Sequence, residues 1–364
     1  MNNQLIVKLP EFYPKYVVQT MSEVYDWGLR DLNIPDIHKE TMGEGITIGV
    51  IDSGKPDHFD VINNICGAIN LSDSNSEMDF VGHGCLVSGI IAAEKNDQGV
   101  IGVAPKSKIY SIKSIGDGGT GDTAALTKGI LTAIEQKVDI ISISAGIFVD
   151  FKPMHEAVKQ AYKNNIIIIC ACGNSADREY DVAFPARYPE TIGVAAYDKK
   201  HKIAPFSSRG TNIAFALPGV DIYSTYLNNS YSTVSGTSFS APLLSGICAL
   251  ILSKHRQSGI INKTPCDTPK QMMEHLMKFA VDLGEGKNVS GFGTVDVKSM
   301  FLEENSTPEP LLAPTVILVP EPAQIQPTEL PVNTVHMPMA ANLPPSRISI
   351  QKWYQDFLKR KNRR

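Results

Sequence analysis

Short apolar, β-branched runs alternate with helix-length segments from about residue 45 to residue 297. The runs predict strands at 47–52, 109–113, 139–144, 166–171 and 191–196. Four of them are nearly continuous in apolar residues, which is typical of strands covered on both faces. The other segments predict helices at 84–94, 123–136, 152–164, 238–255 and 268–281. We therefore expect an α/β fold with a doubly wound, mostly parallel sheet and helices on both faces.

The composition changes abruptly after about residue 303. Residues 306–346 hold 10 of the 23 prolines, which predicts an extended linker. Residues 347–364 place Trp353, Phe357 and other apolar residues at helical offsets among seven Lys or Arg and one Asp. Such a tail could dock on a partner, lie on an acidic surface, fold back on the domain or order only weakly. We expect four parts: an N-terminal extension (1–24), one large domain (25–303), a Pro-rich linker (304–346) and a basic amphipathic tail (347–364).

Length, charge and cysteine content narrow the class of protein. The chain has 364 residues, of which 43% are hydrophobic, and this excludes a small disulfide scaffold or a wholly disordered chain. Its net charge of −4 gives the whole molecule no electrostatic reason to bind nucleic acid. The N-terminus carries no secretory signal, and no apolar run approaches the roughly 18 residues of a membrane span. Together with six cysteines lying mostly in apolar runs, this predicts a cytoplasmic protein with reduced thiols.

Three segments place a reactive side chain where a strand or loop meets a helix. Asp52 ends a predicted buried strand, at the sheet edge where α/β proteins collect ligands. His83 stands between two glycines, which allow close approach of other backbone. Ser238 opens a long predicted helix, whose first turn offers unpaired N–H groups to a developing oxyanion. Taken singly, each also suits a structural role as a turn residue, a packed histidine or a helix cap.

Together, Asp52, His83 and Ser238 supply the parts of a nucleophilic triad. A serine hydroxyl is a poor nucleophile until an imidazole takes its proton and a carboxylate holds that imidazole in the right tautomer. The order Asp, His, Ser along the chain matches that of subtilisin and differs from those of chymotrypsin and the α/β-hydrolases.

Residues from about 27 to 297 resemble the subtilisin-family serine endopeptidases, or subtilases. The matching segments read WGL at 27–29, VIDSG at 50–54, HG at 83–84, GVIGVAP at 99–105, CGN at 172–174, FSSRG at 206–210, ALPG at 216–219 and GTS at 236–238. The resemblance implies hydrolysis of peptide bonds through an acyl-enzyme, with protein or peptide substrates and no cofactor required for the chemistry.

The resemblance also implies roles around the triad. Asn174 matches the family's oxyanion-hole asparagine, whose amide joins the Ser238 backbone N–H. The substrate would lie as an extended strand between two edge segments, which here read Gly119, Thr120, Gly121 and Ser144, Ala145, Gly146. Departures from the family pattern at Cys85, Leu86, Phe239 and Ser240 remove no proton-transfer group. A thiol at Cys85 would make activity sensitive to thiol reagents.

Subtilases often bind structural calcium, and a loop at 94–100 matches that site. The resemblance implies ligation by the Asn96 side chain, the carbonyls of Glu94, Gln98 and Val100, and Asp60. A polar surface turn without a metal is the alternative, and Lys95 inside the loop adds a positive charge.

The N-terminus resembles that of the intracellular subtilisins, whose short extension blocks the active site until it is removed. Residues 5–10 could form such a block or a plain N-terminal arm. Three functions stay open: a general intracellular protease, a maturation protease that cuts one peptide, and a degenerate domain that serves as a binding scaffold. The set of four site residues argues against the last.

Overall fold

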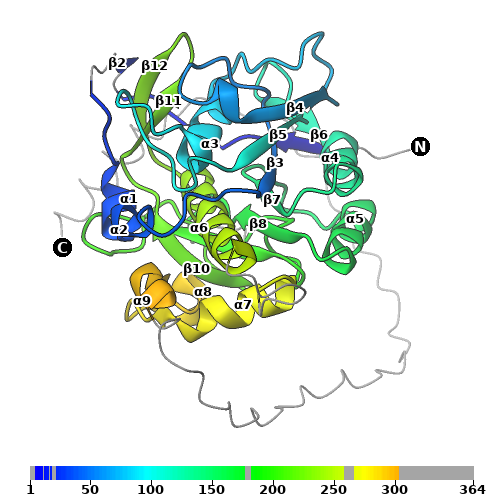
Figure 1. Ribbon diagram of the computed structural model, residues 1–364. Helices are drawn as coiled ribbons and strands as arrows, with labels where there is room; N and C mark the ends of the chain where they lie inside the picture. Colours follow the sequence, from blue (N-terminus) through cyan, green and yellow to red (C-terminus); the bar gives the residue numbers. More distant parts are fainter. Residues whose placement is uncertain are drawn as a thin grey trace, which may run out of the picture. The chain divides into compact units, whose positions relative to one another are not determined.

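The computed structural model describes residues 5–10, 12–15, 17–18, 22–176, 182–257 and 266–302 (Figure 1). These residues all belong to the first of two units of the chain, Met1–Thr307. The predicted linker at 304–346 and the predicted tail at 347–364 lie outside the described residues.

A seven-stranded sheet, parallel at every pairing, forms the centre of the fold. Across the sheet the strands run in the order β10 (Ile213–Pro218), β9 (Ile192–Tyr197), β8 (Ile167–Ala171), β7 (Ile140–Ile143), β3 (Thr47–Asp52), β5 (Lys108–Lys113) and β4 (Ile65–Asn70). The five predicted strands are the five inner ones. The two edge strands, β4 and β10, were not predicted.

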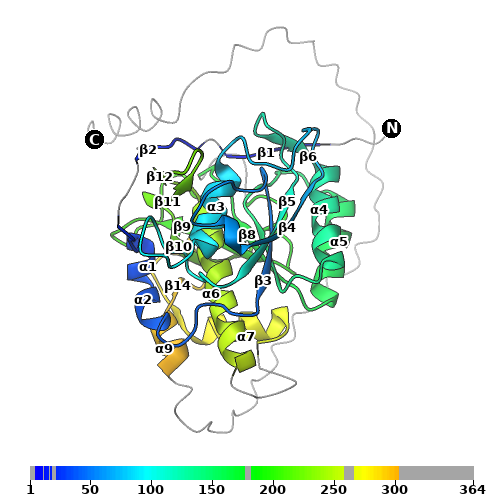
Figure 2. The same cartoon turned by 45° about the horizontal axis from the view of Figure 1, so that its top comes forward.

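Four long helices cover the two faces of this sheet, as the alternating pattern predicts (Figure 2). On one face α3 (His83–Ala92) packs against α6 (Thr237–Gln257), and on the other α4 (Thr123–Glu135) packs against α5 (Lys152–Lys163). The doubly wound α/β class is therefore confirmed.

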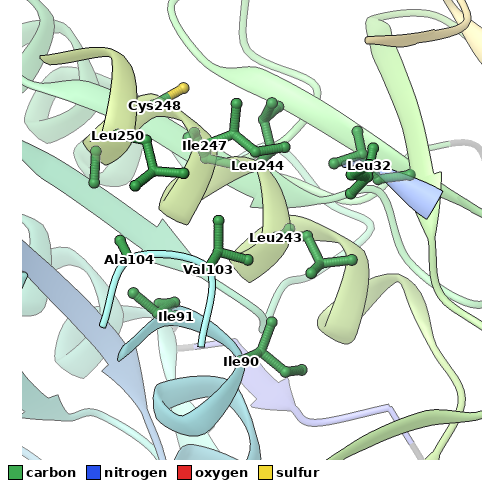
Figure 3. Close-up of a cluster of buried hydrophobic side chains, with 14 of the residues drawn as sticks. Leu32, Ile90, Ile91, Val103, Ala104, Leu243, Leu244, Ile247, Cys248 and Leu250 are labelled. Carbon is green, nitrogen blue, oxygen red and sulfur yellow. The ribbon is translucent and has the colours of Figure 1, made fainter. Parts of the chain in front are cut away.

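Successive side chains of β3 point to opposite faces of the sheet, so this one strand contributes to the hydrophobic core on both faces. Ile48 and Val50 join the core that includes α3 and α6, whereas Ile51 joins the core beneath α4 and α5. Figure 3 shows part of the first layer, in which Leu243 of α6 lies near Ile90 of α3. Because every side chain of β3 from Ile48 onward is buried, the strand delivers Asp52 to the sheet edge on a rigid support.

Helix α6 combines unusual length with burial. It is the one helix within the described ranges that is long and apolar enough to cross a membrane, but 94% of its most apolar window is buried inside the fold. That burial identifies α6 as the core helix of this domain. Its first turn contains Ser238, so the packing of α6 fixes where this serine lies.

Smaller elements surround this framework. The helical ones are α1 (Trp27–Asp31), α2 (Ile34–Ile37), the 3-10 helix η1 (Ile62–Asn64), α7 (Pro269–Lys278), α8 (Lys287–Ser290) and α9 (Val297–Leu302). The strands are β1 (Ile6–Lys8), β2 (Val17–Val18), β6 (Thr120–Asp122), β11 (Ile222–Tyr226), β12 (Ser230–Val234), β13 (Ala280–Val281) and β14 (Thr294–Val295). Two of them, β1 and β2, belong to the predicted N-terminal extension and pair with β6 and β12.

Candidate active site

Asp52 and His83 form a buried pair at the carboxyl end of β3. The imidazole Nδ1 lies 2.8 Å from Oδ1 and 2.9 Å from Oδ2 of Asp52. The Asp52 side chain is 1% exposed and the His83 side chain is not exposed at all. With Nδ1 donating to the carboxylate, the ring presents Nε2 as its acceptor. That tautomer is the one that a general base requires.

A tight turn ahead of α3 aims His83 at Asp52. Gly82 has φ 88°, a left-handed conformation that glycine adopts without strain. Buried Asp79 accepts hydrogen bonds from the amides of Val81, Gly82 and Cys85 and from the Ser53 hydroxyl. Burial raises the pKa of Asp79, although the hydrogen bonds from Gly82 and Cys85 oppose this shift. Sequence reasoning missed this residue. Its signal in the sequence is an Asp three residues ahead of Gly82, the glycine that precedes helix α3.

Ser238 lies at the start of α6 and is 1% exposed. Its hydroxyl Oγ donates to the backbone carbonyl of Ser144 at 3.2 Å, and its own carbonyl accepts from the Ser144 hydroxyl at 2.9 Å. The edge segment at 144–146 and the start of α6 are therefore tied together. In the part of the chain that the structure describes, His83 Nε2 has no hydrogen-bond partner.

Asn174 follows β8 and contacts the residues immediately before Ser238. Its Oδ1 accepts from the Thr237 amide at 3.0 Å and from the Thr237 hydroxyl at 2.8 Å. A Cβ added to Gly236 would lie 3.0 Å from Asn174 Nδ2. Because Thr237 holds Oδ1, the amide group turns its N–H donors toward the loop that carries Ser238.

The N-terminal segment lies between the two predicted substrate edges. Strand β1 pairs antiparallel with β6, placing Val7 opposite Gly121 and Lys8 opposite Thr120. Lys8 also bridges to Gly146, and the Leu9 amide donates to the Gly119 carbonyl at 3.2 Å. Strand β1 thus lies between the two edge segments, of which one is Gly119, Thr120 and Gly121 and the other is Ser144, Ala145 and Gly146.

Beyond β1 the chain crosses the imidazole. The Phe12 ring lies edge-on to His83 with centroids 5.0 Å apart, and Phe239 lies 5.5 Å from the same ring. The chain then meets β12, where the Lys15 amide donates to the Thr233 carbonyl. Phe12 has no sequence motif around it, so its place over His83 could be found only from the structure.

The predicted calcium loop closes around Asp60. Its carboxylate accepts from Asn96 Nδ2 at 2.9 Å, from the Val100 amide at 3.1 Å and from the Tyr231 hydroxyl at 2.8 Å. Asn96 Oδ1 accepts from the Gln98 amide, and the Glu94 amide donates to the Asp60 carbonyl. All five predicted residues are therefore gathered in one place. Glu23, which was not predicted, joins them by accepting from the amides of Asn96 and Asp97.

This donor set is compatible with a hard cation. It consists of carboxylate, amide and carbonyl oxygens, and half a turn of the Asn96 amide would present Oδ1 in place of Nδ2 to the neighbourhood of Asp60. Oxygen donors of this kind are the ligands that calcium prefers.

Cys85 does not support the expected sensitivity to thiol reagents. The side chain is 1% exposed, and its Sγ donates to the Thr225 hydroxyl at 3.6 Å. Burial, followed by the nearby Asp79 charge, raises the pKa of the Cys85 thiol, so the reactive thiolate is suppressed.

Comparison with known proteins identifies the family. Residues 43–295, more than half of the chain, match the model of the subtilase family. An intracellular serine protease of Paenibacillus polymyxa is 35% identical over 275 residues, which cover 73% of this chain and 83% of the relative. The major intracellular serine protease of Bacillus subtilis is 36% identical over 242 residues, covering 64% and 76%.

One further relative is named as an extracellular protease. The minor extracellular protease Epr of Bacillus subtilis is 36% identical over 276 residues, which cover 75% of this chain but only 41% of Epr. The match therefore spans less than half the length of that relative. The fold, the family model and these relatives agree: this chain belongs to the subtilase family of serine endopeptidases.

Proposed function

We propose that Ser238 is the nucleophile of a peptide-bond hydrolysis for which His83 is the general base and Asp52 orients the imidazole. One observation carries this proposal: His83 Nδ1 is held by both oxygens of Asp52, which leaves Nε2 as the proton acceptor. The Ser238 hydroxyl turns about its Cα–Cβ bond from the Ser144 carbonyl toward Nε2. It then attacks the substrate carbonyl carbon while His83 takes its proton.

Asn174 stabilises the charge that this attack creates. As the tetrahedral intermediate forms, its oxygen accepts from the Asn174 amide and from the Ser238 backbone N–H at the start of α6. His83 then gives the proton to the leaving amine, and the C–N bond breaks to leave an acyl-enzyme on Ser238. Water attacks this ester by the same route and frees the serine.

Replacing Ser238 by alanine tests the assignment. We expect Ser238→Ala to lower kcat for a peptide substrate by roughly 10⁶-fold, the loss that follows removal of the corresponding serine in subtilisin. Ser245→Ala is a matched control, because Ser245 lies on the same helix and its hydroxyl donates within α6, to the Ala241 carbonyl. Substantial activity in Ser238→Ala, or an equal loss in both variants, would refute the assignment of the nucleophile.

We further propose that residues 5–15 act as an inhibitory extension. The support is their position: β1 occupies the place of a substrate strand between the two edge segments, and Phe12 lies over His83. A peptide that is added as a strand binds mainly through main-chain hydrogen bonds. A substrate would therefore compete with β1 for the same backbone groups of the edge segments. An extended peptide can enter only after this segment has left or been cut.

Two truncations test this role. We expect deletion of residues 1–15 to raise kcat/KM by about tenfold or more. In the full chain only a small fraction of molecules has a site free of this segment, whereas in the truncated chain every site is free. Deletion of residues 1–4 is the control, because it keeps β1. If the two truncated chains and the full chain hydrolyse a peptide equally well, the extension is a plain arm.

We propose that the loop around Asp60 holds a structural calcium ion. Asp60, Asn96, Glu23 and the carbonyls of Glu94, Gln98 and Val100 would supply its oxygens, and the ion would stabilise the fold without entering the chemistry. We expect a chelator to lower the melting temperature of the Ser238→Ala chain and excess calcium to restore it. The Asp60→Asn variant should not recover its melting temperature when calcium is added back. An unchanged melting temperature in the parent chain would exclude the site.

The intracellular relatives support a cytoplasmic location, which we propose for this chain. They do not separate a general protease from a maturation enzyme dedicated to one peptide. A cleavage profile on a peptide library distinguishes the two, because a dedicated enzyme cuts one sequence and spares the rest.

A further inference from the structure

Three side chains of the kinds that bind transition metals meet at the C-terminal end of α6. His255 lies on α6, Cys266 precedes α7 and His275 lies on α7. Their ligand atoms all lie within 4.8 Å of one another. The two imidazoles stand nearly perpendicular, with centroids 5.8 Å apart and an interplanar angle of 86°.

This cluster is remote from the catalytic residues. His255 follows Ser238 by 17 positions on one helix, which at 1.5 Å per residue separates them by about 25 Å. Neither the triad nor the loop around Asp60 contributes a residue to it. A role in the hydrolysis itself is thereby excluded.

We propose that His255, Cys266 and His275 form a zinc site that fastens α6 to α7. A thiolate with two imidazoles is a donor set that suits Zn²⁺ and is unsuited to calcium or magnesium, which prefer oxygen. In a tetrahedral zinc site with Zn–N near 2.0 Å and Zn–S near 2.3 Å, neighbouring ligand atoms lie about 3.5 Å apart. Small side-chain shifts within the present cluster reach that spacing.

The surroundings suit a zinc ion held by three protein ligands and one water molecule. Cys266 is fully buried, whereas the two histidines are partly exposed, which leaves a fourth coordination position to water. Lys254 borders the same recess, but it pairs with Glu40 at 2.8 Å and so its charge is largely offset.

The site would stabilise the last part of the domain. Zinc binding joins α6 to α7 across the connection at residues 258–265, whose own structure is outside the described residues. Because the metal binds the folded chain and not the unfolded one, its binding energy adds to folding. The inference is independent of the catalytic assignment, since it involves neither Ser238 nor His83.

Metal content and cobalt spectra test the proposal. The full-length Ser238→Ala chain, which cannot digest itself, is expressed with zinc, passed through gel filtration and analysed for metal. We expect one zinc per chain, retained in a Cys66→Ser control whose thiol is exposed on the edge strand β4. Cys266→Ser should weaken zinc binding by more than about 100-fold, because removing a ligand costs more than removing the residues that support one.

Cobalt distinguishes this site from binding elsewhere. When Co²⁺ replaces Zn²⁺ in the folded parent chain, we expect a thiolate-to-cobalt charge-transfer band and the intense d–d bands of four-coordinate cobalt. His275→Ala should weaken the four-coordinate bands and leave circular dichroism unchanged. The proposal is overturned if the parent chain holds no zinc after gel filtration, if it gives no thiolate-to-cobalt band, or if Cys266→Ser binds zinc as tightly as Cys66→Ser.

Discussion

At the scale of single residues, close backbone contact brings Asp52 and His83 together. Gly84 follows His83, and its amide donates to the Ser53 hydroxyl at 2.9 Å. A Cβ at this position would lie 2.7 Å from the Gly54 carbonyl oxygen, which is backbone and has little freedom to move. The glycine thus permits the strand that bears Asp52 and the helix that bears His83 to approach within hydrogen-bond distance.

Replacing Gly84 by alanine should separate these two elements. We expect Gly84→Ala to destabilise the domain by about 1–3 kcal/mol, the usual cost of overpacking, and to reduce kcat because Asp52 and His83 move apart. Gly286→Ala is the matched control, since its φ is −67° and a Cβ there meets nothing within 4 Å. Thermal unfolding and peptide hydrolysis measure both effects. Equal behaviour of the two variants would contradict this account of the contact.

At the scale of elements, α1 depends on a buried carboxylate. Asp26 caps this helix by accepting from the Gly28 amide at 2.7 Å, and it accepts from the Tyr223 amide of β11 at 2.9 Å. Burial raises the pKa of Asp26 to about 6, although these hydrogen bonds oppose the shift. The folded chain therefore binds this proton more tightly than the unfolded chain, in which the pKa is near 3.8.

The sign of the resulting pH dependence follows from linkage. As pH rises from about 4 to 6, Asp26 loses its proton in the unfolded chain before it does so in the folded chain. The free energy of unfolding therefore falls over this range, and the loss reaches about 3 kcal/mol above pH 6. In the Ser238→Ala background, Asp26→Asn should abolish this contribution. Denaturant unfolding at several pH values measures it. Parallel pH profiles with and without Asp26→Asn would show that Asp26 does not titrate in this range.

Also at this scale, the sequence predicted the inner strands better than the edges. Four of the five inner strands are nearly continuous apolar runs, because helices cover both of their faces. The edge strand β4 contains Gly67 and Asn70 and is mostly half-buried, which weakens both the pattern and the propensity. The other edge strand, β10, ends in Pro218, which a strand at the edge of a sheet tolerates and an inner strand does not.

The site residues that sequence reasoning found are those with a chemical motif. Asp52, His83, Asn174 and Ser238 each stand in a short recognisable segment. Asp79 and Phe12 act through burial and position, and these follow from which segments meet in space.

At the scale of the whole molecule, one helix connects two proposed sites. Ser238 begins α6, and His255, near its other end, belongs to the proposed zinc cluster. Between them α6 is buried against α3 and the central sheet, so the nucleophile rests on the most extensively packed element of the domain. The same packing permits little movement of Ser238 other than rotation of its hydroxyl.

Reaction with a fluorophosphonate tests the central claim most directly, because this reagent forms a stable adduct only with an activated serine. The chain lacking residues 1–15 is treated with the reagent and digested, and the adduct is located by mass spectrometry. We predict one adduct, on Ser238, that is lost in His83→Ala and retained in Ser245→Ala. An adduct on another serine, or labelling of Ser238 that persists at the same rate without His83, would contradict the account.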